Sequence, residues 1–366
     1  MYLTRLNIHS LRNLHEATLF PHPQFNFFFG SNGSGKTSLL EGIHLLAVGR
    51  SFRTRQIQTL IAHQKNTLAC FGEMHDAHGI KTSLGIEKNR QGEVRCKVAG
   101  ESCERLSVFA SLLPLQLITP ETFKLLVAGP EERRKFLDWG VFHVEHTFSG
   151  LCQRYQRLLK QRNAALKQSK SAKSSPLQVW EKELAAVGEK ITVHRQAHLV
   201  ALKPFLEEAR LALLPSHPIQ FEYAQGWPAG KTLEAALFDA ASQDERWGYT
   251  SVGPHRAEVE VNLEGFAAHH VLSRGQQKLL VCALHLAQAQ QLFAATGKKC
   301  IYLIDDLASE LDSTNRARLL SLLAAQQHQV FLTGVDAQGW QAVCEQFGGE
   351  MFHVEQGQIQ GLCLQA

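Results

Sequence analysis

The stretch Gly30-Ser31-Asn32-Gly33-Ser34-Gly35-Lys36-Thr37 decides the fold of this chain. It matches every fixed position of the pattern G-x-x-x-x-G-K-[ST], the phosphate-binding P-loop. A short apolar run, Phe25 to Phe29, precedes it, and apolar residues at helical spacing follow Lys36. The order strand, loop and helix is the context that the motif requires, so a flexible glycine loop that matches by chance is the weaker interpretation.

The residue types in this loop predict that it binds MgATP. Glycines allow successive backbone N–H groups to point at phosphate oxygens, and the following helix adds the positive end of its dipole. We expect Lys36 to bridge the β- and γ-phosphates and the Thr37 hydroxyl to ligate Mg²⁺. The predicted nucleotide-binding residues of the loop are Gly30, Ser31, Asn32, Gly33, Ser34, Gly35, Lys36 and Thr37.

Two acidic residues, Asp305 and Asp306, follow an apolar strand at residues 300–304. Burying adjacent carboxylates without a use for them is costly. We expect Asp305 to hold Mg²⁺ through water and Asp306 to orient the attacking water or act as its base, so that Lys36, Asp305 and Asp306 form the catalytic set. Taken alone, a solvated turn in which Asp306 caps the next helix is equally compatible. The presence of a P-loop favours the catalytic interpretation.

The remaining pattern predicts an α/β protein whose α/β material is split by a helical insertion. Residues 67–98 alternate between apolar and polar, with turn residues at 76–79 and 89–92, as in an antiparallel meander. Helical spacing then begins at Pro130 and continues to about Leu166, breaks at 169–176, and resumes from Trp180 until Pro204 ends or kinks the helix. This is a short helical hairpin arm. We expect an N-terminal head segment at 1–120, a helical lobe at 121–246 and a C-terminal head segment at 247–366.

Composition narrows the class of protein. The chain has 366 residues, 44% of them hydrophobic and 20% charged, with a net charge of +4, which permits nucleic-acid binding without requiring it. No apolar stretch reaches the roughly 18 residues that a membrane span needs, and the first residues lack the apolar core of a signal peptide. The eight cysteines form no C-x-x-C pair. We therefore expect a cytoplasmic protein with reduced thiols and no membrane contact.

A second phosphate-binding feature precedes the apolar helix at 275–294, where Ser273 and Gly275 offer a hydroxyl and an unhindered backbone amide at a helix N-terminus. One chain does not need two sites for one γ-phosphate, whereas two chains arranged head to tail do. Taken alone this is weak evidence, because helices capped by serine and glycine are common.

The segment 272–278 resembles the L-S-G-G-Q signature of ABC-type ATPases, and 309–312 is similar to the D-loop that lies at their dimer seam. Six segments, in order along nearly the whole chain, together resemble the RecF family of bacterial recombinational-repair ATPases. These segments are Leu11–Asn13, Ser51–Thr54, Arg133–Asp138, Gly253–Arg256, Ser273–Lys278 and Asp305–Asp312.

The resemblance implies an ABC-type, Rad50-like ATPase head with an antiparallel meander and a compact second lobe. It implies a homodimer formed on ATP binding, in which Ser273 and Gly275 of one copy close over the γ-phosphate of the other. It further implies binding to single-stranded, gapped and duplex DNA, work with RecO and RecR in loading RecA at gaps and stalled forks, and a link to the SOS response. The ATPase is expected to be weak, DNA-stimulated and used as a conformational switch.

Three residues depart from the general ABC pattern. Arg274 stands where the transporter signature has glycine, and Asp306 replaces the usual glutamate, which favours slow hydrolysis. Thr333 occupies the approximate place of the switch histidine, and its role as a γ-phosphate sensor is open. Gln116 is a candidate for the glutamine loop or, equally, a buried strand amide.

The predicted DNA contacts rest on a basic run without acids, which comprises Arg154, Arg157, Lys160, Arg162, Lys167, Lys170 and Lys173. This run makes a cationic face suited to phosphates, although most such runs are solvated helix faces. Aromatic residues are not interleaved with it, so we expect structure-selective rather than sequence-specific binding. Residues 133–135 either contact DNA or pair with Glu131 and Glu132. For His255 and Arg256, nucleotide, dimer and folding roles all remain open.

Three other classes are less compatible. The ATPase subunit of a membrane transporter shares both phosphate motifs, but the helical arm, Arg274 and the missing switch histidine argue against it. A structural SMC or Rad50 protein would need a far longer arm. A GTPase would need an Asn-Lys-x-Asp segment to read guanine, and the chain has none.

Overall fold

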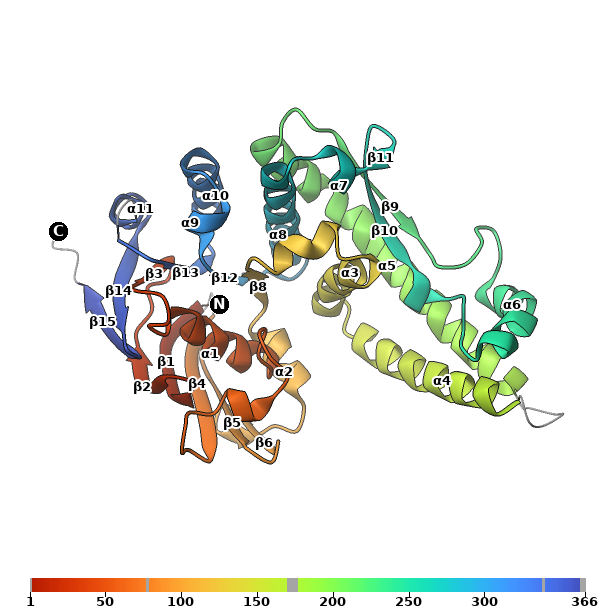
Figure 1. The fold of residues 1–366 in the computed structure, drawn as a ribbon, viewed down its shortest axis with the longest axis horizontal. Helices are drawn as coiled ribbons and strands as arrows, with labels where there is room; N and C mark the ends of the chain where they lie inside the picture. Colours follow the sequence, from red (N-terminus) through yellow and green to blue (C-terminus); the bar gives the residue numbers. More distant parts are fainter. Residues whose placement is uncertain (1, 77–78, 170–176, 338–339, 363–366) are drawn as a thin grey trace. The chain divides into compact units, whose positions relative to one another are not determined.

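The computed structural model describes residues 2–76, 79–169, 177–337 and 340–362 (Figure 1). The chain forms two compact units: the first contains residues 1–123 and 296–366, and the second contains residues 124–295. This division differs from the one predicted from the sequence, because residues 247–295 belong to the second unit. Their strands and helices pack against the helices of the middle of the chain.

The first unit contains a six-stranded sheet in the order β15-β14-β3-β13-β12-β8, parallel except for β15. Its strands are β3 (Phe25–Phe29), β8 (Leu115–Ile118), β12 (Ile301–Ile304), β13 (Gln329–Gly334), β14 (Gly349–Glu355) and β15 (Gln358–Leu362). All residues of β12 and β13 are buried, which explains the continuous apolar sequence of β12 and the apolar run at 330–332 in β13. The P-loop and the paired aspartates follow β3 and β12, two parallel strands that flank β13.

A second sheet in this unit is antiparallel, in the order β2-β1-β4-β5-β6-β7. Its strands are β1 (Tyr2–Leu11), β2 (Leu14–Leu19), β4 (Thr67–His75), β5 (Lys81–Asn89), β6 (Val94–Val98) and β7 (Glu101–Ser102). The meander predicted at 67–98 is confirmed as β4, β5 and β6, with a turn at 89–92. Residues 77 and 78 of the other predicted turn lie outside the described residues.

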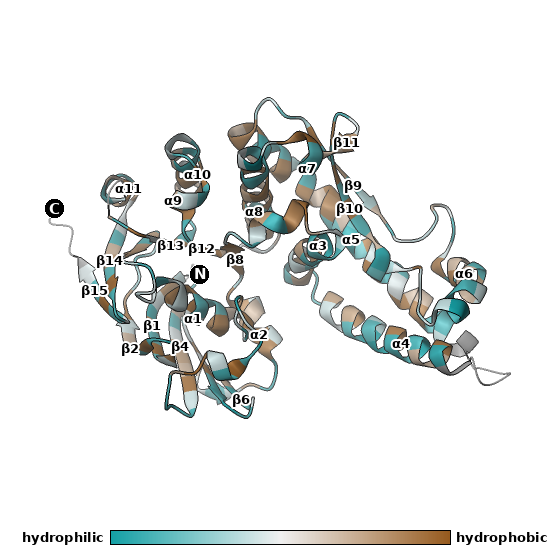
Figure 2. Ribbon diagram, in the orientation of Figure 1, coloured by the Kyte–Doolittle hydropathy of each residue, from teal (hydrophilic) through white to brown (hydrophobic). Residues whose placement is uncertain are grey.

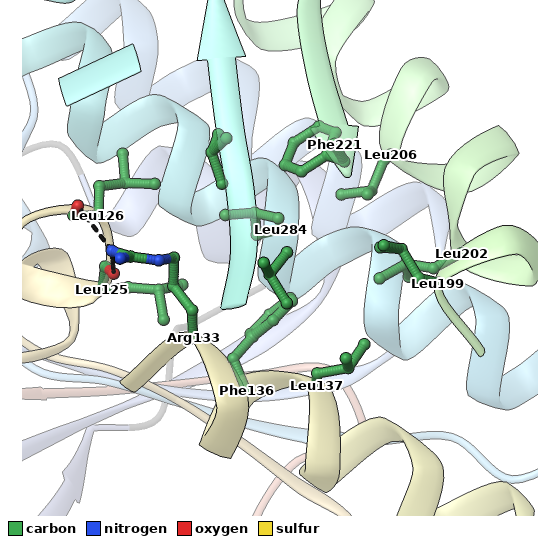
Figure 3. A pocket seen from close by; sticks show the side chains of 12 residues that line it. Leu125, Leu126, Arg133, Phe136, Leu137, Leu199, Leu202, Leu206, Phe221 and Leu284 are labelled. Carbon is green, nitrogen blue, oxygen red and sulfur yellow. Dashed lines mark hydrogen bonds between the residues drawn. The ribbon is translucent and has the colours of Figure 1, made fainter. Parts of the chain in front are cut away.

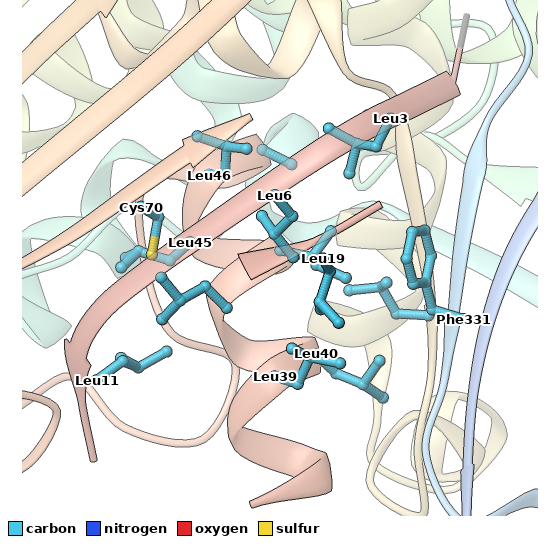
Figure 4. Packing of buried hydrophobic residues seen from close by; sticks show 14 of the residues in the cluster. Leu3, Leu6, Leu11, Leu19, Leu39, Leu40, Leu45, Leu46, Cys70 and Phe331 are labelled. Carbon is cyan, nitrogen blue, oxygen red and sulfur yellow. The ribbon is translucent and has the colours of Figure 1, made fainter. Parts of the chain in front are cut away.

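Helix α1 lies in the main core of the first unit. The helical elements of this unit are α1 (Lys36–Val48), η1 (Ile57–Thr59), α2 (Leu106–Leu112), α9 (Leu307–Glu310), α10 (Ser313–Ala325) and α11 (Gln341–Phe347), and η2 (Thr122–Leu126) leads into the second unit. Figure 4 shows leucines of α1 packed among side chains of both sheets, from Leu6 on β1 to Phe331 on β13. Each such leucine contributes about 1.5–3 kcal/mol when fully buried. The helix that follows the P-loop is therefore fixed by the core.

The second unit confirms the predicted helical hairpin, since α4 and α5 pack against each other around Tyr155, Leu184 and Ile191. Its elements are α3 (Pro130–Val144), α4 (Phe148–Ser169), α5 (Leu177–Leu213), β9 (Ile219–Ala224), α6 (Leu233–Trp247), η3 (Pro254–Arg256), β10 (Glu258–Leu263), β11 (Phe266–Ala267), α7 (Ala268–Val271) and α8 (Arg274–Thr296). Pro204 lies inside α5 and does not end it. Residues 170–176 of the predicted exposed loop lie outside the described residues.

Helix α8 is long and apolar enough to cross a membrane, which corrects the expectation that no stretch of the chain has this length and composition. Two thirds (67%) of its most apolar window is buried inside the structure, as in the core helix of a globular domain. Figure 2 shows the contrast with α4, along which hydrophilic residues predominate.

The Phe28→Ala variant tests the core that supports the P-loop strand. Phe28 is fully buried and stacks on Phe352 at 4.9 Å between ring centroids. We expect its loss to lower the free energy of unfolding by about 3–5 kcal/mol. The control Phe20→Ala removes a ring that is 65% exposed, and should change stability by no more than about 0.5 kcal/mol. Urea unfolding followed by circular dichroism compares the two, and equal losses would contradict this account of the core.

Candidate nucleotide-binding site

The backbone of the P-loop requires glycine at its first position. Gly30 has a φ of 147°, and a Cβ added there would lie 2.2 Å from the carbonyl oxygen of Val354 on β14. Gly35, at the last position before α1, has a φ of 122°. Both values lie where residues with side chains are rarely found. The loop therefore folds closely against β14 and leads directly into α1.

The Lys36 ammonium lies over this loop. Its Nζ donates hydrogen bonds to the carbonyl oxygens of Gly30 (2.7 Å) and Ser31 (2.8 Å). Burial lowers the pKa of Lys36, and the nearby carboxylates of Asp305 and Asp306 act in the opposite direction. A cation that bonds to two loop carbonyls is already placed among the amides that would surround a phosphate.

Asp305 joins the P-loop helix to the adjacent strand of the sheet. The Thr37 hydroxyl donates to both carboxylate oxygens of Asp305 (3.1 and 3.2 Å), and the buried Thr333 hydroxyl at the end of β13 donates to Oδ1 (2.6 Å). This set of a hydroxyl and a carboxylate, all oxygen donors, fits Mg²⁺, which is usually held by one or two carboxylates, substrate phosphates and water. The described residues contain no cluster of three or more metal-ligating His, Cys, Asp or Glu side chains. Thr37 and Asp305 would hold Mg²⁺ together with the phosphates of a nucleotide and water.

Asp306 is held in an unusual backbone conformation next to Asp305. Its φ is 53° and its ψ is 45°, its backbone N–H donates to the Thr333 hydroxyl (2.9 Å), and its carboxylate accepts from Ser309 (2.8 Å). Left-handed backbone at a residue other than glycine costs free energy and occurs often at functional sites. Although Asp306 precedes α9, its side chain makes no capping hydrogen bond. The alternative that Asp306 is simply a helix cap therefore loses support.

Thr333 is the residue whose role was left open by the sequence. It bonds both to the Asp305 carboxylate and to the Asp306 backbone, so it orients the acidic pair. Gln116, the candidate for the glutamine loop, is buried in strand β8. It is not among the residues that line the cleft at the P-loop. The structure favours the buried strand amide for Gln116.

The P-loop lines a cleft of about 350 Å³ in the first unit. It is formed by Asn32, Gly33, Gly35, Lys36, Thr37, Ser38, Arg53, Pro120, Asp305, Asp306, Thr333, Gly334 and Val335. Arg53 and Pro120 were not predicted as site residues. Arg53 lies in Ser51–Thr54, one of the six segments that resemble the RecF family, and this resemblance is the only sequence feature that indicates a functional role. No spacing rule connects Arg53 to the P-loop.

Two further segments support the P-loop from behind. In the segment 11–13, Arg12 forms an ion pair with the fully buried carboxylate of Glu41 on α1. The same carboxylate accepts a hydrogen bond from Ser51 of the segment 51–54. Asn13 donates to the carbonyl oxygen of Gly33 (3.2 Å) and accepts from Ser38 (3.1 Å). The segments at 11–13 and 51–54 thus fix the loop and its helix.

The second feature that the sequence predicts to bind phosphate lies in the second unit, at the N-terminus of the 23-residue helix α8. The Ser273 N–H donates to Gln276 Oε1 (2.8 Å), and the Gln276 N–H donates weakly to the Ser273 hydroxyl (3.4 Å), as in a capping box. Ser273, Arg274 and Gly275 are all exposed, and a Cβ added at Gly275 would meet no atom within 4 Å. The helix end is therefore rigidly capped and open to a partner.

The family follows from comparison with known proteins. The RecF/RecN/SMC N terminal domain family matches residues 2–360. The DNA replication and repair proteins RecF of Pseudomonas paraeruginosa and Stutzerimonas stutzeri are 42% and 44% identical over 363 and 365 residues, and each match covers 98% of this chain and 97% of the relative. The chain belongs to the RecF family. The fold agrees with that of a recombination mediator protein RecF solved with ATP, with a TM-score of 0.88 and 24% identity over 99% of this chain and 98% of the other.

Membership of the RecF family makes this chain an ABC-type P-loop ATPase of the SMC-like group. The predicted fold class, an α/β ABC-type head with a helical second lobe, is confirmed. The P-loop residues, Asp305, Asp306 and Thr333 lie together in the first unit. Ser273 and Gly275 belong to the second unit.

The basic run of this RecF-family chain is only partly available to DNA. Arg162 is fully buried, where it pairs with Asp244 (2.7 Å) and Glu181 (2.9 Å), so its prediction as part of a cationic face is wrong. Arg154 is exposed but pairs with Glu183 (2.6 Å). The sequence pattern did not distinguish these roles, because the acidic partners come from other helices.

Besides Arg154, three members of that run are exposed on α4: Arg157, Lys160 and Lys167. None of them forms an ion pair with another described residue. Lys170 and Lys173 lie outside the described residues.

Residues 133–135 serve the fold of the second unit. Arg133 pairs with both carboxylate oxygens of Glu258 (2.8 and 2.7 Å) and donates to the carbonyl oxygens of Leu125 and Leu126 beside a small apolar pocket (Figure 3). Arg134 donates to the carbonyl oxygen of Ala257 (2.7 Å). Lys135 pairs with Glu131 and Glu132, as the simpler alternative proposed.

His255 has a folding role in the second unit. Its Nε2 donates to the carbonyl oxygen of Thr250 (3.1 Å), which leaves Nδ1 to accept from the Tyr155 hydroxyl (2.8 Å). Burial lowers the pKa of His255 to about 4, so the ring is neutral at physiological pH. Its neighbour Arg256 is exposed.

The Arg12→Ala variant tests the support behind the P-loop. It leaves the buried Glu41 carboxylate without its cationic partner, and we expect a loss of about 3–5 kcal/mol in the free energy of unfolding and weaker ATP binding. The control Arg5→Ala removes an arginine of β1, the strand that ends just before Arg12, and breaks an exposed pair with Glu73 at 3.7 Å. It should cost no more than about 1 kcal/mol. Urea unfolding and titration with a fluorescent ATP analogue measure both effects. Unchanged ATP affinity and stability in Arg12→Ala would contradict this role.

Proposed function

We propose that the protein is a DNA-binding ATPase of recombinational repair in which two copies enclose each nucleotide between them. The observation that carries this proposal is that the chain holds two separate features whose geometry suits a phosphate. One is the cleft with Lys36, Thr37 and Asp305, and the other is the exposed, capped N-terminus of α8 at Ser273. A helix N-terminus with free amides attracts a phosphate by its dipole and its N–H groups.

In this proposal the residues of one cleft bind and orient ATP. Lys36 moves from the two loop carbonyls to the β- and γ-phosphates, and the P-loop amides surround the same oxygens. Thr37 and, through water, Asp305 would hold Mg²⁺, which screens the phosphate charge when bound. Asp306 orients the attacking water. Hydrogen bonds with Ser309 and Thr333 hold Asp306 in place. Ser273 and Gly275 of the second copy then complete the γ-phosphate site.

The biological setting that we propose is repair at single-strand gaps and stalled replication forks in the cytoplasm. The relatives at 42% and 44% identity are named DNA replication and repair proteins, and the similar solved structure is described as part of the RecFOR pathway. These support a role with RecO- and RecR-like mediators in loading RecA and inducing the SOS response. Slow, DNA-stimulated hydrolysis would act as the switch that opens the dimer and releases gapped or duplex DNA.

The competing function, the ATPase subunit of a membrane transporter, predicts no response to DNA. The comparison with repair proteins over 98% of the chain disfavours it. ATPase rates measured with and without gapped DNA at several salt concentrations separate the two functions. Stimulation by DNA at low salt supports the repair function, and an unchanged rate would count against it.

The Lys36→Met variant tests the cleft. It removes the only charge that we assign to the β- and γ-phosphates, and we expect at least a tenfold loss of ATP affinity, about 1.4 kcal/mol. Calorimetric titration measures the affinity. Lys135→Met, which removes an exposed lysine of the second unit, serves as the control and should bind ATP normally. Normal ATP binding by Lys36→Met would remove the cleft from the account.

The Ser273→Arg variant tests the contribution of the second copy. A bulky cation at the tip of α8 should leave ATP binding to the single chain intact within about twofold while it prevents ATP-induced dimers. Thr232→Arg is a matched control, because Thr232 is an exposed cap of α6 in the same unit. Sedimentation with a non-hydrolysable ATP analogue reports the association state. Normal dimers of Ser273→Arg would rule out enclosure of nucleotide between two copies.

A further inference from the structure

Two large aromatic side chains are exposed and stacked on each other at the end of α6 in the second unit. Trp247 is 47% exposed and Tyr249 is 40% exposed, and their rings lie 5.4 Å apart at an angle of 21°. The Arg256 guanidinium lies over the Tyr249 ring, 5.4 Å from its centroid. These three flat groups form one aromatic platform, and neither ring belongs to the hydrophobic core between α4 and α5.

The loop that carries Tyr249 is held by buried hydrogen bonds. Asn163 of α4 accepts from the Thr250 N–H (2.8 Å) and hydroxyl (2.7 Å), and Arg162 donates to the same hydroxyl (2.9 Å). Asp244 pairs with Arg162 and also accepts from the Ser251 N–H (2.9 Å). The buried Arg162 therefore helps to fix the loop that carries Tyr249, through its bonds to Asp244 and Thr250. A rigid platform binds a flat ligand with little loss of conformational entropy.

The exposed cations of α4 lie beside this platform. Lys167 packs its aliphatic stem against Gly248, where an added Cβ would be 3.4 Å from the lysine Cγ. Lys160 is exposed two turns earlier on the same side of the helix. The acidic Asp244 is already neutralised by Arg162, and Glu245 is the exposed acid next to it in the sequence. The surroundings of the two rings thus carry more positive than negative charge.

We propose that the Trp247–Tyr249–Arg256 platform stacks on an unpaired base of single-stranded DNA while Lys160 and Lys167 contact the adjoining phosphates. This rests on the proposed DNA-binding function and adds a site to it. Bases within a duplex are already stacked on their neighbours. An aromatic side chain can therefore stack on a base only where the strand is unpaired. Stacking tolerates every base, because each has a π-face. The site would favour gapped over continuous duplex DNA without reading sequence.

The sequence did not reveal this site because the basic run contains no interleaved aromatic residue. Folding brings Trp247 and Tyr249, about 80 positions later in the chain, beside the C-terminal half of α4, since α4 and α6 pack together. Figure 1 shows these two helices in the same part of the second unit.

The test measures binding of the full-length protein to three fluorescent ligands of equal length: an oligo-dT strand, the same backbone without bases, and a duplex. For Trp247→Ala and Tyr249→Ala we expect about tenfold weaker binding to oligo-dT, but less than a twofold change for the abasic strand and the duplex. Trp247→Phe keeps a stacking ring and should bind oligo-dT almost normally. Phe238→Ala is the matched control, because Phe238 is a 76% exposed ring on the same helix.

A second readout separates phosphate contacts from base contacts. Lys167→Gln should weaken binding to both the oligo-dT and the abasic strand and reduce the salt dependence of each by about 0.7 in the log–log slope, as for one phosphate. Unchanged oligo-dT affinity in Trp247→Ala and Tyr249→Ala, in a protein that binds DNA, would overturn the platform and leave the proposed function standing. Failure of the unaltered protein to bind any of the DNA ligands would overturn both. Circular dichroism of each variant guards against misfolding.

Discussion

The Asp305 carboxylate, which accepts hydrogen bonds from Thr37 and Thr333, connects the parts on which nucleotide chemistry depends. Thr37 lies in the first turn of α1, Asp305 directly follows β12, and Thr333 lies in β13, so one carboxylate connects three separate elements. Thr333 is fully buried and the other two residues are half-buried, and a polar group withdrawn from water is costly unless it has a partner. Here each has one, and the same network holds the Asp306 backbone. The hydrogen bonds that give these polar groups their partners therefore also determine the geometry of the cleft.

The parts of the site that the sequence predicted well are those with fixed local spacing. The P-loop pattern specifies eight consecutive residues, and an apolar strand that stops at two aspartates indicates where the strand ends. The sequence alone therefore predicts both. The supporting residues have no such pattern. Glu41 lies within α1, yet its partners Arg12 and Ser51 come from segments before and after that helix. Spacing along the chain does not report pairs that only the tertiary fold brings together.

In the helical lobe, the sequence likewise does not show which charged residues pair in the folded structure. A run of basic residues without acids looked like a continuous cationic face, but Arg162 is fully buried because Asp244 and Glu181 come from α6 and α5. Breaking such a buried pair costs several kcal/mol, whereas an exposed pair contributes little. The run therefore divides into structural and exposed members. Similarly, the predicted boundary at residue 247 differs from the division into compact units, because α/β periodicity identifies strands and helices but not the unit in which they pack.

The central claim, that each nucleotide is completed by a second copy, is tested most directly by mixing two inactive proteins. In a mixture of Lys36→Met and Ser273→Arg chains, a mixed dimer contains one site with an intact P-loop and an intact opposing Ser273. The account predicts that the ATPase rate of the mixture exceeds the sum of the two separate rates, with DNA present. Rates that simply add, from variants shown to be folded, would contradict enclosure of the nucleotide between two copies.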